Sequence, residues 1–472
     1  MSASTTAPLS IAAAGRRRPA LVAAERDDLD AWPNTTRAMP WALAGFLVML
    51  WLVPFQDIRL PIRLPVDARL DRFVLGGIVL VWVAALLAGG RAAPRLRRTP
   101  VNIGVAVFLG LAVASVLLNL QVLVNVDDFS LAVKKLALLL AYAAFFFVAA
   151  SVLRPPEVRS FVALTIALAC IAALGTIWEY RTGTNLFYDL TAKALPPGFS
   201  LGAETLDSEF GRPAVTGPTQ HGLALTTMLA FALPLTVVGV VRSPTLGRKL
   251  AYSAATAVVV AGTVATLRKT AVLVPAAALL IMLVYWRGQL LRLAPLGLVL
   301  VMVIQVLSPG ALASIRGQLQ PDRLSSSDST QGRTADYTAV APDVKAHLAT
   351  GRGYGTYDSH KYRLLDNQYL VLLIETGVLG VLAYVGMMIA VVAVAHRVIR
   401  SGDPERAPPA LAAAAAVGAL LVAMALFDVL AFPQAPYLFF FMAATAVVCA
   451  VKTETRQPGP GPRMQEAFEP AR

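Results

Sequence analysis

The sequence predicts an all-α, polytopic membrane protein of about 12 transmembrane helices, with a long, partly helical extracytoplasmic loop. Only 15% of its 472 residues are charged, whereas a soluble chain carries roughly 25%. Apolar segments recur along the whole length, most of them near the ~20 residues that cross a bilayer. Because lipid offers no partner for a free backbone N–H or C=O, each segment must be helical. A large water-soluble catalytic domain is therefore excluded.

Twelve segments are expected to span the membrane: Trp41–Pro54, Phe73–Gly90, Val101–Leu120, Leu131–Leu153, Ser160–Trp178, Gly222–Val241, Leu250–Leu267, Thr270–Trp286, Leu293–Pro309, Tyr369–Ala395, Ala410–Ala431 and Pro436–Val451. Residues 1–37 and 452–472 are predicted disordered cytoplasmic tails. Spans one to nine occupy residues 38–309, with an outer loop at 179–221, and spans ten to twelve occupy 367–451. The large outer loop, residues 310–366, is too long to be structureless in a compact protein, so we expect it to be partly helical.

The loops divide by charge. Arginines cluster after the second, fourth, sixth, eighth and tenth spans, whereas the loop Gln121–Ser130 carries two aspartates. Since cytoplasmic loops are enriched in Lys and Arg, both termini are predicted to be cytoplasmic. The same rule accounts for most of the net charge of +13, so nucleic acid is not expected as a partner. The 2 cysteines and 4 histidines form no ligand cluster, and no metal or other cofactor is expected.

One pair of basic residues departs from the positive-inside rule. Arg268 and Lys269 occupy a short hairpin on the predicted outer side. They could be snorkelling side chains at a helix end. They could instead form a site for an anionic group at the outer mouth of the bundle, where the planar fork of arginine suits phosphate oxygens.

Further outer cations are individually weak signals but share one predicted side of the membrane. They are Arg212 and His221, which bracket a Gly/Pro-rich segment before the sixth span, and Arg333 and Arg352 in the large loop. Lys134 and Lys135, near the outer end of the fourth span, are expected to snorkel. Together these residues make a cationic outer surface.

The strongest local pattern begins at Asp366-Asn367-Gln368-Tyr369 and continues into the tenth span. If a helix starts near Asp366, its carboxylate shares a face with Gly377 and Gly380, which would let a neighbouring helix approach. Asp366 is then either a functional carboxylate or a plain helix N-cap. Glu375, on the opposite face, is predicted to be paired within the bundle or to face a wet cavity.

These residues resemble the O-antigen ligase and O-antigen polymerase superfamily of bacterial membrane glycosyltransferases. The shared features are Asn367 followed after nine residues by Gly377-Val-Leu-Gly380, the turn Gly351-Arg-Gly-Tyr-Gly355, and the arginines Arg268 and Arg212. The resemblance covers about residues 175–395. One departure is that Asp366 stands where the ligases have a histidine, which favours a polymerase-like member.

The resemblance implies transfer of a glycan from a polyprenyl-diphosphate carrier to an acceptor glycan, on the outer face of the cytoplasmic (inner) membrane. It implies catalytic roles for Asp366, as base, and for Arg268, at the leaving diphosphate. Substrate-binding roles fall to Arg212, His221, Lys269, Arg333, Arg352, Asn367 and Tyr369. Membrane lipids and other polysaccharide-export proteins are the further partners it suggests.

Two other functions stay open. A ligase would attach a finished glycan to a different envelope acceptor. A transporter, such as a lipid-linked oligosaccharide flippase, would move the carrier without making a bond, but transporters often show two similar halves, and no half-repeat is recognisable here.

Overall fold

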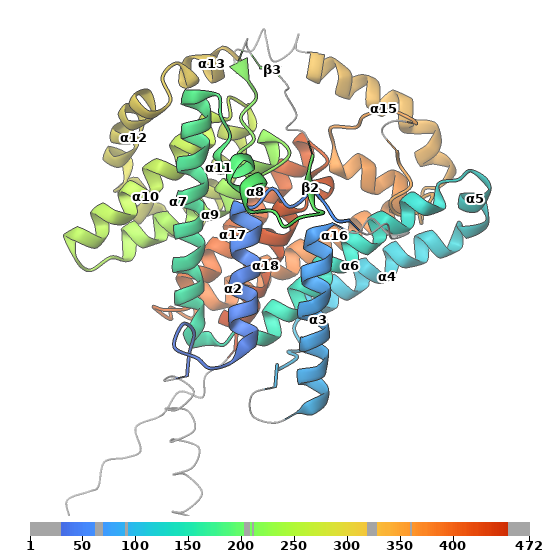
Figure 1. The fold of residues 1–472 in the computed structure, drawn as a ribbon, viewed down its shortest axis with the longest axis horizontal. Coiled ribbons are helices and arrows are strands. Elements are labelled where there is room, and N and C mark those ends of the chain that lie inside the picture. Colours follow the sequence, from blue (N-terminus) through green and yellow to red (C-terminus); the bar gives the residue numbers. More distant parts are fainter. Residues whose placement is uncertain are drawn as a thin grey trace, which may run out of the picture.

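The computed structural model describes residues 30–61, 69–89, 93–202, 208–209, 212–318, 328–358 and 361–451. All twelve expected segments form helices (Figure 1). The helices are α2 (Ala38–Leu52), α3 (Leu70–Ala88), α4 (Pro100–Leu118), α5 (Leu120–Asn125), α6 (Phe129–Val152), η2 (Pro155–Glu157), α7 (Val158–Thr182), α8 (Leu186–Ala194), α9 (Gly222–Arg242), α10 (Leu246–Ala265), α11 (Thr270–Leu291), α12 (Ala294–Leu307), α13 (Ala311–Gln318), α15 (Asp328–Ala346), α16 (Gln368–Arg400), α17 (Ala407–Leu426), η3 (Val429–Ala431) and α18 (Gln434–Cys449).

Two short antiparallel strand pairs complete the described fold. β1 (Ile58–Arg59) pairs with β2 (Ser200–Leu201), and β3 (Ser208–Glu209) pairs with β4 (Arg212–Pro213). The described part of the chain is therefore all-α apart from these strands. The large loop predicted to be partly helical contributes α13 and α15.

Eight of the described helices are long and apolar enough to cross a bilayer: α3, α4, α6, α7, α9, α11, α16 and α17. Helices α2, α12 and α18 are apolar but shorter, with 10–17 residues. The protein is thus a multi-pass membrane protein, while the count of about 12 spans stays a prediction.

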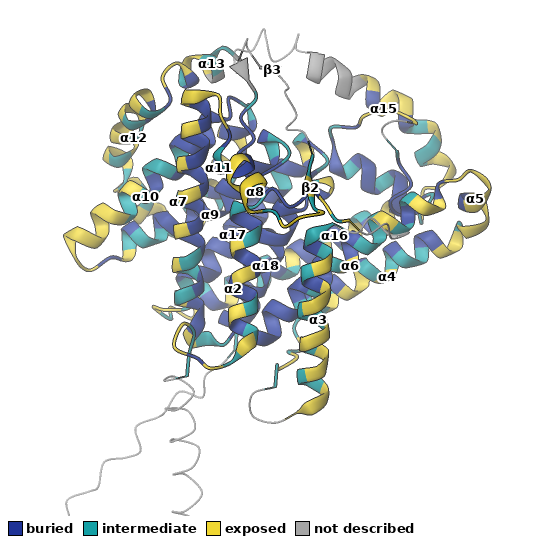
Figure 2. Ribbon diagram, viewed as in Figure 1, coloured by how far each residue is buried: buried dark blue, intermediate teal, exposed yellow. Residues whose placement is uncertain are grey.

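The centre of the bundle is formed by α9, α17 and α18, whose residues are mostly buried (Figure 2). The ring of Tyr437 on α18 packs edge-on against Phe46, Tyr142 and Phe145, and its hydroxyl donates to the Asp71 carboxylate at 3.0 Å. Only 11% of the apolar stretch of α3 is buried. Its exposed leucines and valines suit lipid contact.

The two ends of the bundle differ. The loop end carries α8, α13, α15 and the paired strands, in the upper half of Figure 1. The opposite end, here called the basic end, brings arginines from several loops and helix ends, among them Arg95, Arg154, Arg242 and Arg406, around one cavity. The helix α7 joins the two ends.

The eleventh span is shorter than predicted. It was expected to reach Ala431, but α17 ends at Leu426. Residues 427–433 form a connecting segment that contains the single turn η3 before α18 begins. Asp428 therefore lies outside the membrane-spanning helix, at the loop end.

Candidate functional site

The hairpin between α10 and α11 places Arg268 against the start of α9. A Cβ built on Gly222 would lie 3.7 Å from Arg268 Nε, an ordinary contact distance, so the arginine side chain lies against the first residue of α9. Beside it His221 is the N-cap of α9, its Nδ1 accepting from the Leu223 amide at 3.2 Å. Two predicted site residues, Arg268 and His221, are thus brought together. The remaining ring nitrogen of His221 is not used by the cap.

The segment that leads to His221 is held by buried polar groups. The Glu179 carboxylate, at the end of α7, accepts from the amides of Thr216 and Gly217 at 2.9 and 2.8 Å. Asn185 donates to the Gly217 carbonyl at 2.8 Å, and Gly217 has a φ of +57°, which favours glycine. This part of the long outer loop is consequently a fixed support for the hairpin.

The N-cap of α16 is Asn367, not Asp366. The Asn367 side-chain oxygen accepts from the amides of Tyr369 and Leu370 at 3.0 and 3.3 Å, and its amide donates to the Tyr337 hydroxyl at 3.1 Å. The alternative in which Asp366 is a plain helix cap is therefore wrong. Its partly buried carboxylate stands just before the helix.

The tenth span is broken at Gly377, so the predicted helical face does not persist. Gly377 has φ 65° and ψ −170°, and the backbone of Ala349 and Thr350 fills the space where its Cβ would be. The close neighbour is therefore the large loop, and not a second helix as predicted. Asp366 and Gly380 do not share the predicted helical face, because the regular 100° step per residue is interrupted at this kink.

The glycine turn 351–355 packs against that kink and is hydrogen-bonded to it. The amides of Arg352 and Gly353 donate to the carbonyls of Ile374 and Glu375 at 2.9 and 3.0 Å. In return the amides of Val378 and Leu379 donate to the loop carbonyls of residues 348 and 349. The two glycine motifs that carry the family resemblance are thus paired backbone to backbone.

Gly351→Ala is expected to lower the free energy of unfolding by about 2–5 kcal/mol, the sum of left-handed backbone strain and overpacking. Gly351 has a φ of +72°, and a Cβ there would lie 2.3 Å from the Glu375 carbonyl carbon. The matched control is Gly386→Ala in α16, where nothing lies within 4 Å. That variant should be neutral or stabilised by up to about 1 kcal/mol. Thermal unfolding in detergent compares the two, and equal stabilities would contradict the seating of the turn.

A buried ionic network lies beneath the turn. Lys135 Nζ of α6 is 3.5 Å from Glu375 Oε1 and donates to the Tyr357 carbonyl at 2.9 Å. The same carboxylate oxygen accepts from the Tyr357 amide at 3.1 Å. Of the two alternatives for Glu375, pairing within the bundle is the one that the structure shows. The expectation that Lys135 snorkels is wrong, because a buried carboxylate and a carbonyl draw its ammonium inward.

Asp428, in the connecting segment, is a site residue that the sequence analysis missed. Its carboxylate is partly buried among Lys135, Glu375 and Asp366. Burial raises the pKa of the Asp428 carboxyl to about 6; Lys135 acts against this, whereas Glu375 and Asp366 add to it. The only sequence signal was one aspartate near the end of an apolar run.

The connecting segment joins the two halves of the site. The amide of Leu430 donates to Gln368 Oε1, at the start of α16, at 2.7 Å. Two residues further on, the Phe432 ring lies 5.6 Å from the His221 ring, measured between centroids. Gln434 Nε2 then donates to the Pro218 carbonyl at 3.3 Å. The connecting segment therefore contacts both the start of α16, near the carboxylates, and the Arg268–His221 corner.

Other predicted site residues have different surroundings. Arg352 is largely buried and engages Asp128 and Asp343 at 3.3 and 3.2 Å and the Tyr362 hydroxyl, so its charge is compensated within the loop. The Tyr369 hydroxyl donates to the Leu421 carbonyl of α17 at 2.9 Å. Lys269 is the half-buried residue that precedes α11. The backbones of Arg212 and Arg333 lie in β4 and α15, while their side chains lie outside what the structure describes.

Residues 254–385 match the sequence profile of the O-antigen ligase family. The chain carries an O-antigen ligase family domain. The domain runs from within α10 to within α16, so it contains Arg268, the glycine turn, Asp366 and the Gly377 kink. His221 and Asp428 lie outside it but border its residues in space. No curated protein matches the sequence.

Proposed function

We propose that this protein polymerises polyprenyl-diphosphate-linked oligosaccharide units into a cell-surface polysaccharide, on the outer face of the cytoplasmic membrane. One observation carries the proposal: the connecting segment 427–433 links Arg268, in the hairpin, to the pair Asp366 and Asp428. These residues lie in or beside the O-antigen ligase family domain. The helices keep the polyprenyl chain in lipid while the sugars react at the loop end.

Arg268 is proposed to bind the diphosphate of the donor. When an acceptor hydroxyl attacks the anomeric carbon, the new C–O bond forms as the bond from that carbon to the phosphate oxygen breaks. Negative charge then grows on the leaving diphosphate. A fixed cation aimed at this group stabilises the transition state more than the ground state. The proximity of His221 and the start of α9 gives the same corner further donors for phosphate oxygens.

Asp366 is proposed to take the proton of the acceptor hydroxyl. It is not consumed as a helix cap, and it lies close enough to Asp428 for their charges to repel. Because this repulsion is mutual, an ionised Asp428 makes Asp366 a stronger base. A base that gains proton affinity near neutral pH is suited to general-base catalysis.

The transfer rate of the wild type is therefore expected to rise as pH increases through about 6, the pKa of the Asp428 carboxyl. The sign follows because the carboxyl is protonated and uncharged below that pH and charged above it. In Asp428→Asn the transfer rate should no longer rise through this pH, and it should be lower than the wild-type rate at neutral pH. The matched control is Asp189→Asn, an exposed carboxyl on α8. The transfer rates of the three proteins are measured as a function of pH. If the rate of Asp428→Asn still rises through about pH 6, Asp428 is not part of the site.

Cells from which the chain is deleted provide the test of the function. A polymerase defect leaves single carrier-linked units and no long polymer. The ligase alternative predicts long polymer still attached to the carrier, and the transporter alternative predicts units confined to the inner leaflet. The substitution of the ligases' histidine by Asp366 favours the polymerase. Extracted lipid-linked glycans, sized on a gel, separate the first two outcomes, and protection from an added external glycosidase separates the third.

A further inference from the structure

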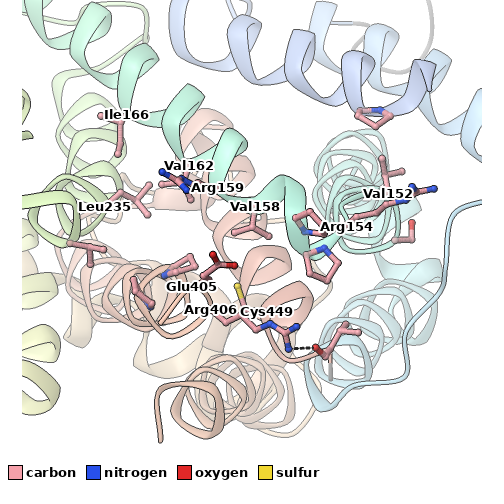
Figure 3. A pocket seen from close by; sticks show the side chains of 18 of the residues that line it. Val152, Arg154, Val158, Arg159, Val162, Ile166, Leu235, Glu405, Arg406 and Cys449 are labelled. Carbon is pink, nitrogen blue, oxygen red and sulfur yellow. Dashed lines mark hydrogen bonds between the residues drawn. The ribbon is translucent and has the colours of Figure 1, made fainter. Parts of the chain in front are cut away.

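A large cavity opens at the basic end, far from the candidate site. It has a volume of about 1760 Å³, more than the roughly 300–1,000 Å³ of an ordinary small-molecule pocket. Its walls come from α2, α3, α7, α9 and α10 and from the loop before α17. Figure 3 shows part of this lining, including Arg159 and Val162 of α7, Leu235 of α9, and Glu405 and Arg406.

The cavity collects positive charge. Eight arginines and a single carboxylate, Glu405, line it. Some of these arginines serve the fold: Arg97 donates to the carbonyls of Ala150 and Leu153 at 2.6 and 3.0 Å, and Arg406 donates to the Val451 carbonyl at 2.6 Å. The acceptors of Arg97 are neutral carbonyls, so they do not compensate its charge, whereas Arg406 also pairs with the Asp403 carboxylate at 3.5 Å.

Three arginines have no such structural task. The side chains of Arg95, Arg159 and Arg248 are exposed, and within the described part of the chain they form no hydrogen bond or ion pair. They come from three separate segments of the sequence, yet all line the same cavity. An anion entering it would meet cations that are already in place and unpaired.

The positive-inside rule explains why this end is basic, but not why its arginines surround a hollow. Arg287, near the end of α11, and Arg292, directly after that helix, obey the same rule and are exposed, yet they do not line this cavity. The rule is thus satisfied by charge on the surface alone. The rule therefore does not explain why so many arginines line one cavity, and a bound anion would explain it.

The deeper walls are apolar. Val162 and Ile166 follow Arg159 along α7, and Leu235 and Val238 of α9 also line the cavity. The site therefore joins a cationic mouth to a hydrocarbon-like interior. A phospholipid has this same division, with an anionic phosphate on two acyl chains, and basic pockets between helices on the cytoplasmic side of membrane proteins bind such headgroups.

We propose that this cavity binds an anionic phospholipid of the inner leaflet. The phosphate lies between Arg159 and Arg248, and the acyl chains run along Val162, Ile166 and Leu235. The site is separate from the proposed reaction, because α7, whose 25 residues span about 37 Å, starts one residue before Arg159 and ends at the loop end. The proposal therefore stands whether or not the chain is a polymerase.

The test uses the purified full-length protein in detergent micelles and follows thermal unfolding. Three additions are compared at equal ionic strength: dioleoylphosphatidylglycerol, dioleoylphosphatidylcholine and inorganic phosphate. We expect the anionic lipid to raise the Tm of the wild type by about 5 °C, and the other two to raise it by less than half as much. The double variant Arg159→Gln/Arg248→Gln should lose most of the shift caused by the anionic lipid.

The matched control is Arg287→Gln/Arg292→Gln, which removes the same charge from the same end and should keep the full shift. All four side chains are exposed, so both variants are expected to fold. Equal shifts in the two double variants would overturn the proposal. So would a full shift from inorganic phosphate, which would mean a site for a free anion, or from the zwitterionic lipid, which would mean that the arginines play no part.

Discussion

Asp366→Asn is expected to fold and insert normally but to slow glycan transfer by about 10²–10⁴, the usual cost of removing a general base. The amide of asparagine cannot take the acceptor's proton. Helix initiation is unaffected because Asn367 supplies the cap of α16, through its bonds to the Tyr369 and Leu370 amides. Lipid extracts from cells that carry the variant should contain unpolymerised carrier-linked units, with protein abundance at the wild-type level.

The control for this prediction is Asn367→Ala, which removes the cap while leaving the carboxylate. It should cost about 1 kcal/mol of stability and lower abundance more than turnover. Asp366→His is expected to retain partial activity, since histidine stands at this place in the ligases that the sequence resembles. A wild-type product ladder from Asp366→Asn would contradict the assignment and turn attention to Asp428 and His221.

Arg268→Ala is expected to lower the transfer rate by about 10²–10³, the scale seen when one preorganised donor to a developing negative charge is lost. Arg268→Lys should recover little of this, because the ammonium is a point charge and cannot pair two phosphate oxygens at once. The measurement is transfer per folded protein, so abundance is quantified for each variant.

Lys193→Ala is the matched control for the charge itself, since Lys193 is an exposed cation of α8 in the outer loop 179–221. It should transfer glycans at the wild-type rate. Full activity in Arg268→Ala would leave the arginine as a snorkelling side chain, whose only task is to reach polar surroundings at the end of a helix.

The sequence predicted the helices well because hydrophobic length and backbone hydrogen bonding leave lipid-embedded segments few alternatives. All twelve expected segments are helical, and the family domain falls where the motifs indicated. Arg268 and His221 were placed on the same side by topology alone. The contact of Arg268 with the start of α9 could not be predicted, because it depends on how the hairpin between α10 and α11 packs.

The errors share one cause, which is long-range packing. The helical wheel failed at Gly377 because the large loop, distant in the sequence, donates and accepts hydrogen bonds there. Asp428 was missed because an aspartate near the end of an apolar run reads as part of the span. Lys135 was taken for a snorkelling residue, since its partner Glu375 lies 240 residues away, and no local pattern pairs them.

Reconstitution tests the central claim most directly. The purified protein is placed in liposomes with carrier-linked glycan units extracted from cells that lack the chain, and products are followed by size. The account predicts a ladder of carrier-linked oligomers together with release of polyprenyl diphosphate, abolished in Asp366→Asn and Arg268→Ala. Units that remain single, or that only cross the bilayer without forming a new glycosidic bond, would contradict it.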